Sequence, residues 1–243
     1  MDVNLEKNKL EKIANSHDTH KDFDGILAYY TGKLIAPQVK DKITLECGCS
    51  TGVMTPMLLE YTNKLDIVEG SAKYAQITEE KYHGRIQMYV SLFEEFHPTQ
   101  QYDAVVFAGV LHHIDKPVDI LEHITKWLRP EGHIYISVPN MTSFHRKLGV
   151  AMGVVDSVYE TSSRNQFFAQ PGRFDMERLI KVCEMANLEI IHKEAFFFKP
   201  FPHDIMNQIH LSSEVLDGLF EMGRKMPAEA CQLYVVARAV NNR

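Results

Sequence analysis

The stretch Leu45-Glu46-Cys47-Gly48-Cys49-Ser50-Thr51-Gly52 decides the fold of this chain. A short apolar run, Ile43 to Leu45, begins just before it, and a second run, Met54 to Leu59, follows it with helical spacing. Strand, glycine turn and helix in this order are typical of an α/β domain. Glycine has no Cβ, so such a turn bends tightly and lets a ligand approach the backbone. Many α/β proteins use a glycine pair only to close a turn, so the rest of the chain must decide.

The composition bounds the class of protein. The chain has 243 residues, 45% of them hydrophobic and 24% charged, which suits a globular α/β protein. A net charge of -6 disfavours tight binding of nucleic acid through its phosphates. The polar N-terminus does not resemble a signal peptide, and no apolar run is long enough to span a bilayer. We therefore expect a cytoplasmic protein.

The cysteine and histidine spacings carry no metal signature. The four cysteines are scattered without the spacing of a redox or zinc motif, which indicates buried thiols in a reducing compartment. The 12 histidines include no HxxxH or HExxH pattern. The sequence therefore predicts no metal site.

Strands and helices alternate through the first part of the chain. Strands are predicted at 43–47, 65–69, 85–90, 103–108 and 133–138, with helices at 24–38, 53–61, 71–82 and 118–128 and a turn at 129–132. The alternation breaks after residue 140. Beyond it we expect a helix at 175–186, a strand at 188–198, a helix at 212–223 and a last strand at 233–239. Residues 1–24 are expected to be mobile or loosely helical. This pattern predicts a parallel sheet covered by helices on both faces.

Polar or glycine-rich segments follow the first four strands. Glu46 and the glycine turn end the first strand, and Glu69 ends the second. Ser91 and Leu92 follow the third strand, and the segment 108–113 follows the fourth. Carboxyl ends of parallel strands are where ligands bind in open α/β sheets. An acid that ends the second strand can accept two hydrogen bonds from a ribose diol.

Four motifs in series resemble those of class I S-adenosylmethionine-dependent methyltransferases. They are LECGCSTG, VEGS, YDAVVFAGVLHHIDKP and LRPEGHIYISVPN, in the right order and spacing over residues 43–140. A dinucleotide-binding fingerprint fits less well, because the Glu46-x-Gly48 start and the HHIDKP stretch are not part of it. The resemblance implies a three-layer Rossmann-like sandwich, with a mostly parallel seven-stranded sheet, an antiparallel last strand and helical cap insertions. It implies S-adenosyl-L-methionine as cofactor and S-adenosyl-L-homocysteine as product.

The resemblance also implies roles for individual residues. Glu46 would face the amino end of the methionine moiety, and Glu69 would hold the ribose hydroxyls. The other expected cofactor-binding residues are Gly48, Cys49, Ser50 and Gly52 at the methionine and ribose, Gly70, Ser91 and Leu92 at the adenine, and Ala108 under the sulfonium. Two positions depart from the family pattern: Ser50 stands where a second glycine is usual, and Ser91 where an aspartate is common. Both are expected to weaken cofactor affinity.

A single domain over residues 1–243 is expected, divided by role. Residues 1–40 would form an N-terminal helical lid, as in similar enzymes, and residues 41–140 the cofactor-binding core. The insertions 141–174 and 199–230 would build the acceptor side, because the core motifs are committed to the cofactor. Cations and aromatic residues in the first insertion suit an anionic small molecule that contains a sugar or phosphate, although any single one of them is more often a solvated charge.

Methyl transfer from a sulfonium needs mainly alignment of the acceptor, and a hydroxyl acceptor also needs a base. The candidate catalytic histidines are His113, which follows the fourth strand, and His145 and His203 on the insertions. The alternative for His112 and His113 is a structural role as hydrogen-bonded histidines. The cysteines near the turn are expected to be packing residues.

The favoured function is methylation of the oxygen or nitrogen of a small-molecule acceptor. The alternatives are methylation of a macromolecule, either tRNA or protein, and a non-catalytic module that binds the cofactor. Net charge and the absence of an Asn/Asp-Pro-Pro-Tyr motif disfavour the macromolecule. The sequence does not name the acceptor or fix the oligomeric state, for which a homodimer is one option.

Overall fold

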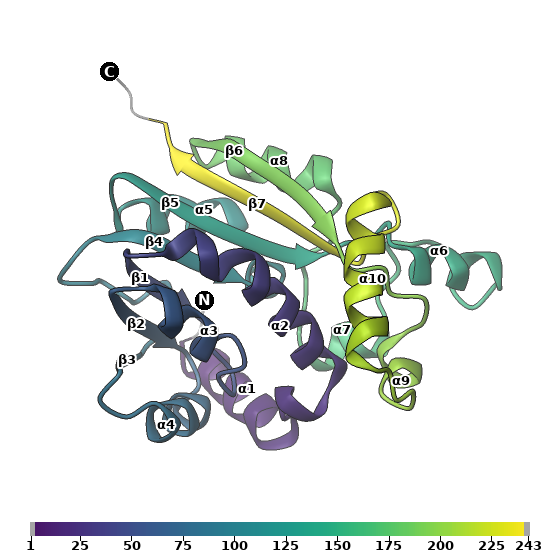
Figure 1. Cartoon of the computed structure of the whole chain (residues 1–243), viewed down its shortest axis with the longest axis horizontal. Helices are drawn as coiled ribbons and strands as arrows, with labels where there is room; N and C mark the ends of the chain where they lie inside the picture. Colours follow the sequence, from purple (N-terminus) through teal and green to yellow (C-terminus); the bar gives the residue numbers. More distant parts are fainter. Residues whose placement is uncertain (1–2, 241–243) are drawn as a thin grey trace.

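A seven-stranded mixed sheet organises the chain, whose computed structural model describes residues 3–240 (Figure 1). The strands are β1 (Ile43–Cys47), β2 (Lys64–Glu69), β3 (Ile86–Val90), β4 (Tyr102–Ala108), β5 (Leu128–Pro139), β6 (Leu188–Phe196) and β7 (Gln232–Ala239). Their order in the sheet is β3-β2-β1-β4-β5-β7-β6. Neighbouring strands pair in parallel except for β7, which is antiparallel to both β5 and β6. This confirms the predicted Rossmann-like fold with its antiparallel last strand.

Helices pack on both faces of the sheet. The α-helices of the described residues are α1 (Val3–Ser16), α2 (Phe23–Ile35), α3 (Thr55–Tyr61), α4 (Ala72–Lys81), α5 (Pro117–Thr125), α6 (Phe144–Ala151), α7 (Ser163–Phe167), α8 (Met176–Met185), α9 (His203–Met206) and α10 (Ser213–Lys225). Short 3-10 helices are η1 (Thr19–Lys21), η2 (Ala36–Val39) and η3 (Leu111–His113). Ser71, Asp175 and Ser212 begin α4, α8 and α10 by accepting a backbone N–H with their side chains. Such polar caps satisfy amides that have no partner within the helix.

Alternation along the strands divides the core into two layers. In β4, Val105 and Phe107 belong to the core with α5 and α8, while Ala104 and Val106 belong to the core with α2, α3 and α10. Successive side chains of a strand point to opposite faces, so a strand covered on both faces must be apolar throughout. The apolar run of β4 is therefore the mark of a central strand.

The structure corrects several predicted boundaries. The expected turn at 129–132 lies within β5, where pairing with β4 shifts register and Glu131 has a φ of 64°. The helix predicted at 24–38 ends at Ile35 and continues as η2, because Pro37 interrupts the α-helical pattern. The strand predicted at 188–198 ends at Phe196, and Phe197 adopts a φ of 62°.

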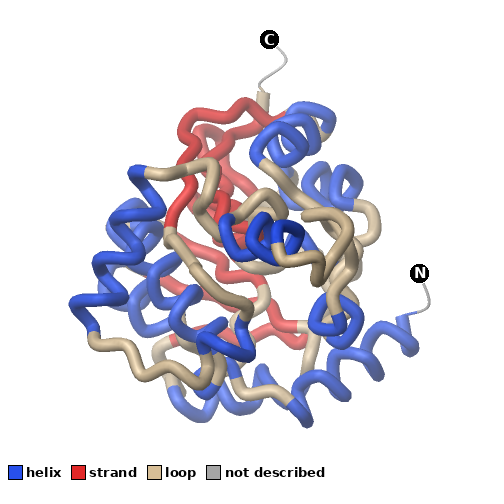
Figure 2. Tube along the Cα trace, turned by 90° about the vertical axis from the view of Figure 1, so that its right-hand side faces the viewer, coloured by secondary structure: helices blue, strands red, loops and turns tan. Residues whose placement is uncertain are grey.

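The inserted segments gather at one edge of the sheet. The arrowheads of β5 and β6 point toward α6, α7 and α9, whereas β7 runs away from them (Figure 1). A view onto that side shows loops and short helices in front of the strands (Figure 2). This edge carries the carboxyl ends of the parallel strands, so the insertions cover the ends at which the sequence predicts a ligand. None of the helices in residues 3–240 is both long and apolar enough to cross a membrane.

Candidate functional site

A cavity of about 600 Å³ lies at the carboxyl edge of the sheet. Its wall includes the ends of β1 to β5, the N-terminal helices and both insertions. Among its lining residues are all the predicted cofactor-binding positions except one: Glu46, Gly48, Cys49, Ser50, Glu69, Gly70, Ser91, Leu92 and Ala108. The three candidate histidines, His113, His145 and His203, also line it. Residues from five strands and two insertions therefore meet around one space of the size expected for small ligands.

The glycine turn shapes one wall of this cavity. Gly48 has a φ of 73°, and its N–H donates to the carbonyl of Val68 at 2.8 Å. Gly52, with a φ of 72°, does not line the cavity, and a Cβ there would lie 3.1 Å from atoms of Thr78 and Tyr82. Gly48 is therefore placed to face a ligand, whereas Gly52 lets α4 pack closely behind the turn.

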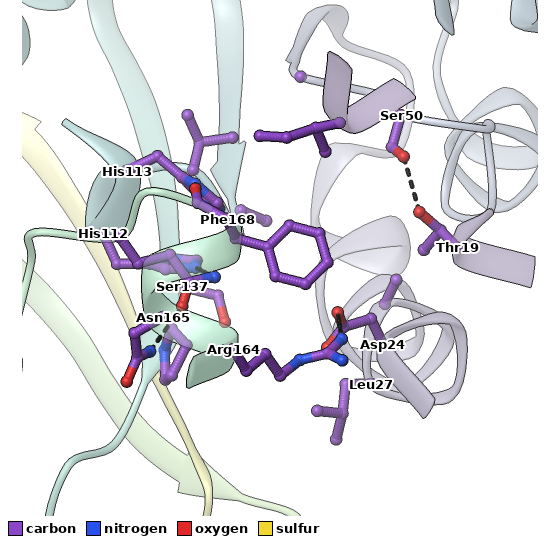
Figure 3. A pocket seen from close by; sticks show the side chains of 18 of the residues that line it. Thr19, Asp24, Leu27, Ser50, His112, His113, Ser137, Arg164, Asn165 and Phe168 are labelled. Carbon is purple, nitrogen blue, oxygen red and sulfur yellow. Dashed lines mark hydrogen bonds and ion pairs between the residues drawn. The ribbon is translucent and has the colours of Figure 1, made fainter. Parts of the chain in front are cut away.

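Ser50 occupies a left-handed position in the same turn, with a φ of 49°. Its hydroxyl lies 2.7 Å from the hydroxyl of Thr19, and its N–H donates to Glu69 at 3.1 Å (Figure 3). At the other departure from the family pattern, the Ser91 hydroxyl donates to the neighbouring carbonyl of Leu92 at 2.9 Å. The serine in the turn thus links it to the N-terminal segment, which the sequence did not indicate.

Two acids are buried at this end of the cavity. Glu46 is 1% exposed and accepts a hydrogen bond from the Thr55 hydroxyl at 2.8 Å, and Glu69 is 6% exposed and accepts from the N–H of Ser71 at 2.9 Å. Neither forms an ion pair with a cation in residues 3–240. Burial, with the negative charge of Glu69 nearby, raises the pKa of Glu46 to about 7. Burial also raises the pKa of Glu69, against the hydrogen bonds from backbone N–H groups. Unpaired buried acids favour a cationic ligand.

The N-terminal segment packs directly against the glycine turn. Besides the contact of Thr19, a ring nitrogen of His20 lies 3.1 Å from the carbonyl of Thr51, and the Tyr74 hydroxyl donates to the carbonyl of His17 at 3.0 Å. His17, Thr19 and Leu27 line the cavity. Helix α1, expected to be loosely helical, runs regularly from Val3 to Ser16 and contacts α4. The N-terminal segment therefore forms part of the cavity wall.

The candidate histidines line the same cavity as the buried acids. The ring Nδ1 of His113 lies 3.1 Å from the carbonyl oxygen of Phe168, and burial lowers its pKa to about 4. Burial, together with Lys199, His203 and Arg146, lowers the pKa of His145 to about 2. The neighbouring His112 is buried, with Nε2 3.1 Å from Gln170. All of these imidazoles are neutral near pH 7.

An ion network joins the start of α2 to both insertions. Arg164 of α7 donates to Asp22 at 2.8 Å and to Asp24 of α2, toward which its guanidinium points (Figure 3). Asp24 also lies 2.7 Å from Nε2 of His203 in α9. Burial acts to raise the pKa of Asp24, but His203 and Arg164 hold it well below its usual range. Asp22, Asp24 and His203 are close enough together to hold a metal ion, yet Arg164 already forms ion pairs with both carboxylates.

The sequence missed several residues of the wall. Lys199 is 3% exposed and lies 2.9 Å from Nδ1 of His203, although its position in the FFFKP stretch gave no indication of burial. Phe168, by contrast, is one of the aromatic residues expected on the acceptor side; it lines the cavity and packs its ring edge-to-face on His17, with centroids 4.8 Å apart. The one signal in the sequence was the position of Lys199 directly after an apolar strand, at the edge of the sheet where ligands bind.

Comparison with known proteins finds similarity to methyltransferases. A family model described as a methyltransferase domain matches residues 45–134. The ubiquinone biosynthesis O-methyltransferase of Actinobacillus pleuropneumoniae serotype 7 (strain AP76) is 22% identical over 171 residues, which are 65% of this chain and 70% of that protein.

Two solved structures share the fold. One is the methyltransferase partner of the Trm112 methyltransferase activator from Haloferax volcanii, with a TM-score of 0.64 and 14% identity over 95% of this chain and 97% of that one. The other is the N-methyltransferase NodS from Bradyrhizobium japonicum WM9 in complex with S-adenosyl-L-homocysteine, with a TM-score of 0.54 and 14% identity over 88% and 86% of the two chains.

The cofactor and the class follow from these findings together. The match begins at Leu45 in β1, just before the glycine turn, and extends through the ends of β2, β3 and β4 into β5. The sheet order and the antiparallel β7 agree with the fold of the solved methyltransferases. Residues 45–134 therefore match a methyltransferase domain, the fold is that of class I S-adenosylmethionine-dependent methyltransferases, and the cofactor is S-adenosylmethionine.

Proposed function

We propose that the protein transfers the methyl group of S-adenosylmethionine to an oxygen or nitrogen of a small molecule. The observation that carries this proposal is the continuity of one cavity from Glu69, at the end of β2, to His145 and His203 on the insertions. Cofactor and acceptor must meet in one space for direct transfer. The insertions cover the acceptor end, which favours an enclosed small molecule over tRNA or a protein.

The cofactor would occupy the end with the two buried acids. Glu46 would take the ammonium of the methionine moiety, and the remaining lone pairs of Glu69 would take the ribose hydroxyls. Gly48, Cys49 and Ser50 would contact the methionine and ribose, and Gly70, Ser91 and Leu92 the adenine. Ala108, at the end of β4, would lie under the sulfonium, which supplies an already activated methyl group.

Calorimetry followed by an acceptor screen tests the proposal. Glu69→Ala is expected to weaken S-adenosylmethionine binding by about 1.5–3 kcal/mol, the scale of hydrogen bonds to a charged group. Glu79→Ala, which removes an exposed acid of α4, is the matched control and keeps full affinity. Unchanged affinity in Glu69→Ala would remove Glu69 from the site. Cofactor binding with no methylation of any small molecule would favour a macromolecular acceptor or a non-catalytic module.

Binding of the cofactor should release a proton from Glu46. In the free protein its pKa is raised to about 7, and an ammonium beside it would lower that pKa. Affinity should therefore rise as pH rises toward 7 and level off above it, by up to about tenfold per pH unit. Calorimetry in buffers of different ionisation enthalpy measures the proton directly. In Glu46→Gln the dependence should vanish; its persistence would assign the proton to another group.

The N-terminal segment is proposed to act as a lid. His17, Thr19 and Leu27 close the wall beside the glycine turn, so a bound cofactor should hold them in place. Trypsin should cut more slowly after the exposed Lys21 when S-adenosylhomocysteine is present. Cleavage after Lys126, which is exposed and does not line the cavity, provides the internal control. Equal protection at both positions would mean general stabilisation, and no protection would argue against a lid.

A further inference from the structure

Lys199 is a buried cation that forms no ion pair with the part of the chain that the structure describes. It lies just after β6, is 3% exposed and lines the cavity. Its Nζ lies 2.9 Å from Nδ1 of His203, and within residues 3–240 no carboxylate oxygen pairs with it. An ammonium has three N–H donors, so two remain after the bond to His203. Buried charges are ordinarily paired, because leaving water is costly.

The acids nearby are already engaged. Asp24 is bound by both His203 and Arg164, and Asp22 by Arg164 and the Asn207 amide. Neither acid is therefore available to Lys199.

A second cation of the wall also lacks a carboxylate. Arg146 donates to the main-chain oxygens of Val158 and Glu160 and forms no ion pair with the described residues. His145 and His203 are neutral near pH 7, because burial lowers the pKa of each. Lys199 and Arg146 are therefore both without an ion-pair partner among the described residues at this end of the cavity, which Asp204 of α9 also lines.

The cofactor end of the cavity has the reverse distribution of charge. Glu46 and Glu69 are buried there without a cation, at the end assigned to the cofactor ammonium. One cavity therefore has unpaired acids at one end and an unpaired ammonium at the other. Such a distribution orients two ligands of opposite local charge.

We propose that Lys199 binds an anionic group of the methyl acceptor, a carboxylate or a phosphate. The inference rests on the proposed function, since it places the acceptor at the insertion end of the cavity. Two oxygens of the anion would accept the two remaining N–H donors as charge-assisted hydrogen bonds. Burial, with the charges of Arg164 and Arg146, lowers the pKa of Lys199 to about 8, so the amine is largely protonated at pH 7 and able to pair. Arg164 forms ion pairs with Asp22 and Asp24, and Lys147 pairs with Glu229, whereas Lys199 has two N–H donors left for the anion.

The test uses the full chain saturated with S-adenosylhomocysteine. Benzoate and phenyl phosphate are the anionic probes, and benzamide is the neutral probe of similar shape, all at one ionic strength. Calorimetry should show benzoate or phenyl phosphate binding at least about tenfold more tightly than benzamide. The anion that binds more tightly identifies the acceptor group as carboxylate or phosphate. Equal affinity for all three probes, or no binding of any of them, would overturn the inference.

Two variants assign the preference to this side chain. Lys199→Gln keeps a donor for His203 but removes the charge, so the preference for anions should disappear while S-adenosylhomocysteine affinity stays. Lys147→Gln, which removes a surface cation paired with Glu229, should keep the preference. If Lys199→Gln does not fold, Lys199→Arg must retain the preference. If folded Lys199→Gln keeps the preference for anions, the assignment to Lys199 is wrong. If the wild-type protein does not bind S-adenosylhomocysteine, the proposed function is wrong instead.

Discussion

Gly48→Val is expected to abolish binding of S-adenosylmethionine. A Cβ at this position would lie 2.9 Å from Cγ2 of Val110, and the two methyl groups of valine would add bulk to the cavity wall. The backbone there has a φ of 73°, where a β-branched residue is strained. The variant therefore loses both the close approach of the ligand to the backbone and the shape of the turn. Calorimetry with S-adenosylmethionine should detect no binding.

The backbone strain must be separated from the loss of the site. Gly84→Val is the matched control, because Gly84 has a φ of 74° and no atom within 4 Å of an added Cβ, and it does not line the cavity. Both variants should lose stability from the left-handed backbone, by about 1–2 kcal/mol. Only Gly48→Val should lose the cofactor. A folded Gly48→Val protein with normal affinity would show that the turn is purely structural.

His113→Asn is expected to lower turnover by about 10²–10⁴-fold if the acceptor is a hydroxyl. A carbonyl oxygen only accepts hydrogen bonds, so the contact with Phe168 places the proton on Nδ1 and leaves the Nε2 lone pair unused. This lone pair can take the acceptor proton as the methyl group moves. Because burial lowers the pKa of His113 to about 4, protonation should reduce the rate only as pH falls toward that value. Cofactor affinity should stay nearly unchanged.

Steady-state kinetics with the acceptor found by the screen separates a base from a packing residue. His123→Asn is the control, since His123 also contacts a main-chain carbonyl, that of Phe96 at 3.1 Å, away from the cavity. A packing role for His113 would lower the melting temperature and both kinetic constants together. His145 and His203 are the next candidates, although His203 already has both ring nitrogens engaged. If His113→Asn, His145→Asn and His203→Asn all keep normal turnover, the enzyme works by proximity on an acceptor that is already nucleophilic.

Much of the cofactor half follows from local sequence. The part of β4 from Ala104 to Ala108 is apolar because both faces of a central strand are covered. Ser71 and Asp175 begin helices through bonds within their own turns. Glu69 reaches the cavity because it ends a parallel strand, and such ends share one edge of the sheet. Each of these features depends on residues close together in the chain. Sequence therefore predicts the sheet and most residues at this end of the cavity.

The acceptor half depends on contacts between distant segments. Arg164 and Asp24 are 140 positions apart, and Asp24 and His203 are 179 apart, so no periodicity or spacing relates them. Whether a lysine is solvated or buried without a partner depends on which carboxylates the fold brings near it and which of them are already neutralised. Sequence by itself determined the sheet and the strand ends at which we propose that the cofactor binds. Tertiary structure alone decided that Arg164 is neutralised and that Lys199 remains unpaired, because charge balance in a cavity is set by all the segments that enclose it.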